Sequence, residues 1–255
     1  MFTFFFYIHL EVINQMNIEI INITENPLQH IGVVAGTCWN APTDNVEKNI
    51  KRAKSCIISG HGRVMEYVDV ELVLSGLSAR CLRELYTHIA GVSRLQSSTR
   101  YVSEENGFDY YIPPKIENDL GNRTMYEVGM NHIQETYNNL LHNEVTKEDA
   151  ANLLPLGMMS KMVWKINLRS LVNFMNRRLC SRALKEIRDF ANELKKMLAS
   201  RNDEWKWIAD SLFVPSCEIY KYRNPNLVFC PEQQCCGRHK KIEDIQIEGV
   251  TKNEN

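Results

Sequence analysis

The chain has 255 residues, and its 30 Lys and Arg against 31 Asp and Glu give a formal net charge of -1 at pH 7. A mean hydropathy of -0.33 and 24% charged residues exclude an integral membrane protein and a disordered chain. A pI near 6.7 argues against a nucleic-acid-binding surface, because phosphate neutralisation needs a clustered excess of Lys and Arg. We therefore expect a small ligand, with no nucleic acid and no membrane as partner.

The first residues differ in character from the rest of the chain. Residues 1–10 are an apolar run that lacks the basic start and small-residue cleavage site of a secretory signal and is too short to span a bilayer. Met16 opens a segment that resembles a natural N-terminal strand, so residues 1–15 are either a mis-called upstream start or an extra segment. Without an export signal we expect a cytoplasmic protein whose eight cysteines are reduced thiols or metal ligands.

The first half of the chain predicts two strands and two helices. Residues 17–23 alternate like a strand, and apolar residues at helical spacing predict a helix over 44–58. Residues 66–74 place valines and leucines on one face and acidic residues on the other, which predicts a strand that ends at Gly76. Ser78 can cap a helix that runs on to His88.

The second half predicts long helices. A polar turn over 93–100 leads into a loop over 101–118, which contains two consecutive prolines. A helix follows over 125–141. The strongest pattern is an apolar stripe over 168–198, either continuous or interrupted near Cys180-Ser181. These elements indicate an α+β fold with a mixed or antiparallel sheet and long helices, organised as a single domain over 16–212.

The segment 83–101 carries the residues best suited to bind an anion. An apolar helix runs into a turn that contains Ser93, Gln96, Ser98 and Arg100. Hydroxyl groups orient a phosphate and a guanidinium neutralises it. Ser- and Thr-rich turns after helices also serve as simple caps, so the turn alone does not decide for a ligand.

Several motifs in fixed order resemble the flavin-dependent thymidylate synthases (the ThyX family), whose signature is Arg-His-Arg, seven or eight residues, then Ser-x-Arg. His88 fits the start of this signature and Ser98-Thr99-Arg100 its end. The resemblance covers about residues 16–240. Its other motifs are similar segments at 20–28, 36–40, 59–67, 110–114, 154–155, 167–174 and 186–188.

The resemblance implies a ThyX-like fold and the reductive methylation of dUMP to dTMP, with methylenetetrahydrofolate as carbon donor, FAD as cofactor and NADPH as reductant. It also implies a homotetramer. It assigns catalysis to Arg178, the nucleotide to Gln96, Ser98, Arg100, Glu84 and Arg178, and the flavin to His88, Asn167, Arg169, Asn173 and His61. Outside the family context Asn167 and Asn173 would be helix caps or solvent-facing residues, and His88 a core histidine.

The route to C5 methylation can be argued from the residues. None of the eight cysteines lies in the motif beside an activating base, which disfavours a covalent cysteine adduct at C6 of the pyrimidine. Arg178, one turn past Asn173, could instead stabilise negative charge that develops on the ring. The flavin and folate then carry the redox and one-carbon chemistry.

The chain departs from the family pattern at several positions. Thr87-His88-Ile89 replaces Arg-His-Arg, and Glu84 stands where the family has Gln. Two alternatives therefore stay open. One is a C5-hydroxymethylase acting on dUMP or dCMP, and the other is an inactive nucleotide-binding or scaffold paralogue.

The C-terminal tail, residues 213–255, contains clustered cysteines and is expected to be disordered at its end. Cys217 follows Pro-Ser, and Cys230 precedes a proline. Thiolates gathered in this way suit a tetrahedral zinc site. The predicted zinc ligands are Cys180, Cys217, Cys230 and Cys236, with Cys235 as an alternative to Cys236 and His239 as a possible replacement for one ligand. The alternative is a set of ordinary reduced thiols.

Overall fold

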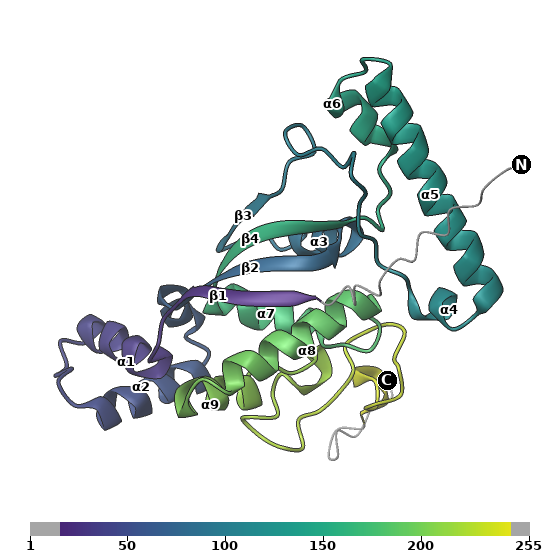
Figure 1. Ribbon diagram of the computed structural model, residues 1–255. Helices are drawn as coiled ribbons and strands as arrows, with labels where there is room; N and C mark the ends of the chain where they lie inside the picture. Colours follow the sequence, from purple (N-terminus) through teal and green to yellow (C-terminus); the bar gives the residue numbers. More distant parts are fainter. Residues whose placement is uncertain (1–15, 246–255) are drawn as a thin grey trace, which may run out of the picture. The chain divides into compact units, whose positions relative to one another are not determined.

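A computed structural model describes residues 16–245, and the predictions for residues 1–15 and for the end of the tail lie outside this part (Figure 1). Strands and helices follow one another along the chain, and the strands form one sheet, which confirms the α+β class. No helix in residues 16–245 combines the length and the apolar character needed to cross a bilayer.

The sheet has four strands in the order β1-β2-β4-β3, formed by Asn17–Ile23, Asp69–Ser78, Met159–Asn167 and Val92–Gln96 respectively. Hydrogen bonds from Ser97 N to Lys161 O and from Asn167 N to Gly91 O show that β3 and β4 run antiparallel. The predicted alternation in β2 is confirmed, because Val70, Leu72 and Leu74 are buried.

Three local predictions were wrong. The loop predicted over 101–118 contains the short helix α4 (Pro114–Glu117), which begins at the second of its two consecutive prolines. β2 continues through Gly76, which takes a positive φ of 70° within the strand, and ends at Ser78. Residues 93–96, predicted as part of a polar turn, belong to the edge strand β3 (Val92–Gln96), so Gln96 lies at a strand end. These residues form a strand because β3 pairs with β4, and pairing with a strand that is distant in the sequence cannot be inferred from local composition.

The contacts divide the chain into two compact units, and several strands run through both. The first unit comprises Val73–Arg83 and Leu95–Val163, together with residues 16–19. Ser78 Oγ accepts a hydrogen bond from Cys81 N, which confirms the predicted cap of α3 (Ala79–Tyr86). The helices wholly within this unit are α4 (Pro114–Glu117), α5 (Leu120–His142) and α6 (Lys147–Ala150), followed by the 3-10 turn Ala151–Leu153.

The second unit comprises Ile20–Leu72, Glu84–Arg94 and the chain from Trp164 onward. Its helices are α1 (Pro27–Cys38), α2 (Val46–Ile58), α7 (Leu168–Arg178), α8 (Lys185–Ala199) and α9 (Asp203–Ser211). Trp164, Phe174 and Phe190 form a fully buried aromatic cluster with ring centroids 5.2–5.9 Å apart. This core fixes α7 and α8 and therefore fixes the side chains that α7 presents.

The apolar stripe over 168–198 is interrupted, as one of the two alternatives predicted. α7 ends at Arg178 and α8 begins at Lys185. Arg188 Nη1 donates hydrogen bonds to the carbonyl oxygens of Ser181 (2.5 Å) and Ala183 (3.3 Å) in the connection. These bonds satisfy carbonyl groups that the interruption leaves outside a helix.

Candidate functional site

A cleft of about 820 Å³ lies in the second unit, along α7 from its N-cap Asn167 to Asn176. This volume is within the range of small-molecule and cofactor sites. Four of the five residues predicted to contact the flavin line it, and the fifth, His61, does not. The lining residues are Met65, Glu66, His88, Ile89, Ala90, Gly91, Asn167, Arg169, Ser170, Val172, Asn173 and Asn176.

A close backbone approach forms one wall of this cleft. Asn167 caps α7 by accepting a hydrogen bond from Ser170 N, so it serves both as a cap and as a cleft residue. Ser170 Oγ donates to Ala90 O at 2.6 Å. Gly91 has a φ of +62°, and a Cβ there would lie 2.1 Å from Asn167 Nδ2, so only glycine fits. The sequence analysis missed Gly91, although a glycine between a helix and a strand was the available signal.

Arg169 and Glu66 form an ion pair at the cleft. Arg169 Nη1 lies 2.6 Å from Glu66 Oε1. Glu66 belongs to the 3-10 turn Gly62–Tyr67, which immediately follows His61. The sequence analysis had quoted Glu66 as part of a motif without giving it a role. An incoming anion would compete with this exposed ion pair for the guanidinium.

Arg178, the last residue of α7, is held by the end of α3 and the residues after it. Its Nη1 lies 2.8 Å from Glu84 Oε2, and its Nη2 donates to Thr87 Oγ1 (2.8 Å) and to Glu84 O (3.2 Å). Its Nε donates to His88 Nε2 at 3.1 Å. The side chain is 17% exposed. Four directed contacts therefore fix a guanidinium that still reaches solvent.

His88 is neutral at physiological pH. Burial and then the neighbouring Arg178 lower the pKa of His88 to about 4. A neutral ring explains how Nε2 can accept the hydrogen bond from Arg178, because the proton then resides on Nδ1. The ring also packs edge-on against Phe174 at 5.2 Å. His88 therefore has two roles, because it lines the cleft and also orients Arg178.

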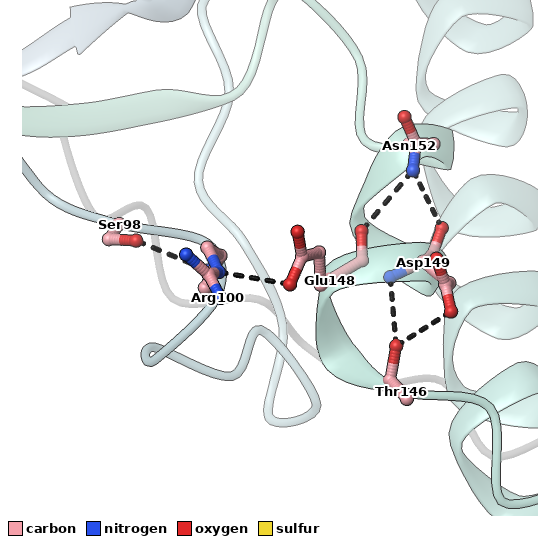
Figure 2. A network of polar contacts seen from close by, with 6 residues as sticks. All are labelled: Ser98, Arg100, Thr146, Glu148, Asp149 and Asn152. Atoms are coloured by element: carbon pink, nitrogen blue, oxygen red, sulfur yellow. Dashed lines mark hydrogen bonds and ion pairs between the residues drawn. The ribbon is translucent and has the colours of Figure 1, made fainter.

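The predicted phosphate-binding residues lie in the first unit. Figure 2 shows Arg100 in an ion pair with Glu148, with 2.9 Å between Nε and Oε2 and both side chains about 60% exposed. Ser98 Oγ accepts a hydrogen bond from Arg100 N at 3.4 Å. Gln96 Nε2 contacts Ser160 Oγ at 3.5 Å. Ser98 and Arg100 therefore share one turn, and the Arg100 guanidinium is accessible to an anion.

The residues of the cleft suit a flavin. Met65, Ile89 and Val172 offer apolar surface for a ring system, and the amides of Asn167 and Asn173 offer hydrogen-bond partners for a polar ring edge. Arg169 and the N-terminal end of α7 bring positive charge for phosphate. When bound there, a flavin would supply hydride transfer, and the side chains would hold and orient it.

In the tail, the structure gathers a different ligand group from the one predicted. Potential ligand atoms of Cys217, Glu218 and His239 lie within 4.8 Å of one another, the only such group in residues 16–245. Of the predicted set, Cys180, Cys230 and Cys236 are not in this group. A hydrogen bond with Ser181, next to Cys180, lowers the pKa of the Cys236 thiol.

The fold and the cleft define an α+β protein with a polar, cofactor-sized site beside a fixed arginine. Residues 19–201 match the family described as thymidylate synthase complementing protein. A flavin-dependent thymidylate synthase of Clostridium tetani is 28% identical over 91% of this chain and 97% of its own. A flavin-dependent thymidylate synthase of Pyrococcus abyssi is 30% identical over 86% of this chain and 91% of its own. The chain belongs to the thymidylate synthase complementing protein family, which confirms the resemblance drawn from the sequence.

Proposed function

We propose that the protein is a flavin-dependent thymidylate synthase, an enzyme that reductively methylates dUMP to dTMP with FAD. The family match over 19–201 carries this proposal. Relatives that bear this name align with most of the chain. They include the enzyme of Clostridium tetani and that of Nitratidesulfovibrio vulgaris, which is 30% identical over 82% of this chain. The cleft supports it, because its volume and lining suit a flavin.

We assign the flavin to His88, Asn167, Arg169 and Asn173, all of which line the cleft. His61, the fifth residue predicted to contact the flavin, immediately precedes the turn that carries Glu66 and does not line the cleft. The loss of two arginines around His88 removes charge that the family uses near the flavin. Arg169 and the α7 N-terminus are the compensating positive charges in this chain.

The nucleotide has two kinds of group to be recognised. Ser98 and Arg100 are suited to its phosphate, because a hydroxyl and an accessible guanidinium share a turn, and Gln96 precedes them. Arg178 is suited to the pyrimidine, where a fixed cation stabilises negative charge on a ring carbonyl. Glu84 holds Arg178 in place and brings a carboxylate to the same position.

NADPH as the reductant and methylenetetrahydrofolate as the carbon donor complete the proposed reaction. We place the protein in the cytoplasm, because no disulfide joins any of the eight cysteines, all of which lie in residues 16–245, and this suits a reducing compartment. A zinc ion in the tail is the remaining proposed cofactor.

We propose a homotetramer from the surface of α5. This helix has 23 residues, yet only Met130 and Tyr137 are buried. Its Leu120, Met125 and Val128 are 81%, 72% and 61% exposed. Large apolar side chains exposed on one helix mark an interaction surface, and closed symmetric assemblies are the common way to cover one. Light scattering should give four chains per particle, and a monodisperse monomer would exclude the assembly.

The proposed reaction can be tested by complementation of a thymidine auxotroph that lacks its own synthase. Growth without thymidine is expected, and purified protein should be yellow with the absorbance of oxidised flavin. Mass spectrometry of the product from dUMP separates a methyl from a hydroxymethyl group. Colourless protein that takes up no added FAD and supports no growth would instead favour the inactive paralogue.

A further inference from the structure

Residues 217–245 of the tail have very little apolar core. After α9, the described residues contain only two short 3-10 turns, Ser216–Glu218 and Ile242–Asp244, and one isolated bridge between Cys230 and Lys241. Between residues 217 and 245, Cys230 alone is buried. Segments with so little buried surface usually depend on a disulfide or a metal ion for their structure, and the cysteines here are free thiols.

Three side chains with different donor atoms converge in this segment. Cys217 Sγ, a Glu218 carboxylate oxygen and a His239 ring nitrogen lie within 4.8 Å of one another, and His239 Nε2 is 3.2 Å from Glu218 Oε1. Bonds of about 2.0–2.3 Å around a tetrahedral Zn²⁺ place its ligand atoms roughly 3.5 Å apart. Small side-chain rotations would therefore bring the three donors onto one ion.

The backbone around these residues holds the arrangement together. Phe229 N donates to Cys217 O at 3.0 Å, and Cys230 N donates to Lys240 O at 2.8 Å. The segments that carry Cys217 and His239 are therefore both hydrogen-bonded to the segment around residues 229–230. Cys235 Sγ donates to His239 O at 3.2 Å and accepts from Gly237 N at 3.3 Å. A further sulfur therefore lies beside the backbone of His239.

We propose that Cys217, Glu218 and His239 bind a structural Zn²⁺ ion that organises the tail. Sulfur, imidazole nitrogen and carboxylate oxygen are the donors that Zn²⁺ takes in proteins, whereas Mg²⁺ and Ca²⁺ select oxygen alone. The fourth position is open to water or to Cys235. This site is independent of the proposed reaction.

The ion would stabilise a surface close to the cleft of the second unit. Ser216 Oγ donates to Asn176 O at 2.9 Å, which joins the residue before Cys217 to α7. Ile219, Tyr220 and Tyr222 line a smaller pocket of about 200 Å³ together with Met65 and Asn176. Because Asn176 and Met65 also line the larger cleft, the tail forms a wall next to it.

Elemental analysis of the full-length protein tests the site. After dialysis against Zn²⁺ and then metal-free buffer, we expect about one zinc per chain in the wild type. Cys217→Ser and His239→Gln should each lower zinc affinity by about 100-fold or more, because loss of a group that only supports a metal ligand already costs about 10- to 100-fold. Cys38→Ser is the matched control, because Cys38 is an exposed cysteine at the end of α1 and should leave the zinc content unchanged.

Two further measurements do not depend on the folding of a variant. Titration of metal-free wild type with Co²⁺ should produce a thiolate-to-cobalt charge-transfer band, and a chelator should make residues 216–245 more sensitive to protease. A wild type that binds neither Zn²⁺ nor Co²⁺ would overturn the proposal. Unchanged zinc affinity in folded Cys217→Ser and His239→Gln would overturn it as well.

Discussion

Replacing Arg178 with alanine is expected to lower turnover by about two orders of magnitude or more, the effect of removing one strong donor to developing charge. The structure gives the reason, because four contacts to Glu84, Thr87 and His88 fix this guanidinium in one orientation. A group fixed in advance stabilises the transition state without a cost of reorganisation. FAD binding should largely survive, because Arg178 does not line the cleft.

The neighbouring residue provides the matched control for this experiment. Arg177 carries the same charge on the same helix, but its side chain is 61% exposed and lies 3.7 Å from Glu232. Arg177→Ala should therefore keep near wild-type turnover. Arg178→Lys keeps the charge but loses the planar fork of donors, so it should be intermediate. Near wild-type turnover in Arg178→Ala, measured with saturating FAD, would rule out the proposed role.

The sequence could place Arg178 on a helix, one turn past Asn173, but could not identify its partners. Helical spacing is local, and it correctly predicted α5 and the segments that became α7 and α8. The contacts of Arg178 join residues about 90 positions apart in the chain. Such tertiary contacts come from packing, which a single sequence does not encode in its periodicity.

The residues of the cleft could also be predicted from the sequence only in part. Motifs of the family pointed to His88, Asn167, Arg169 and Asn173, and the structure brings these four together. Gly91 was missed because its role is to let the backbone approach Asn167, and that approach depends on the pairing of β3 with β4. The strand β3 was itself missed, since five residues with three polar side chains do not show a clear alternation.

Replacing Arg100 with alanine is expected to raise the KM for dUMP by about 10- to 100-fold, the value of one hydrogen bond to a charged group. The turnover number should change much less, because the phosphate is remote from the reacting carbon and is bound equally well before and during the reaction. Arg100 can serve in this way because its guanidinium is 61% exposed and its present partner, Glu148, is a surface carboxylate. Steady-state kinetics with dUMP varied at saturating cofactors measures both quantities.

Glu148→Gln separates a phosphate contact from a structural ion pair. An exposed pair of this kind contributes only about 0.2–1 kcal/mol to stability, so neither variant should unfold the protein. Glu148→Gln leaves Arg100 in place and removes a competing negative charge (Figure 2), so its KM should stay the same or fall. If Glu148→Gln instead raised the KM as much as Arg100→Ala, the ion pair would be the functional element and the assignment of the phosphate to Arg100 would be wrong. An unchanged KM in Arg100→Ala would exclude that assignment directly.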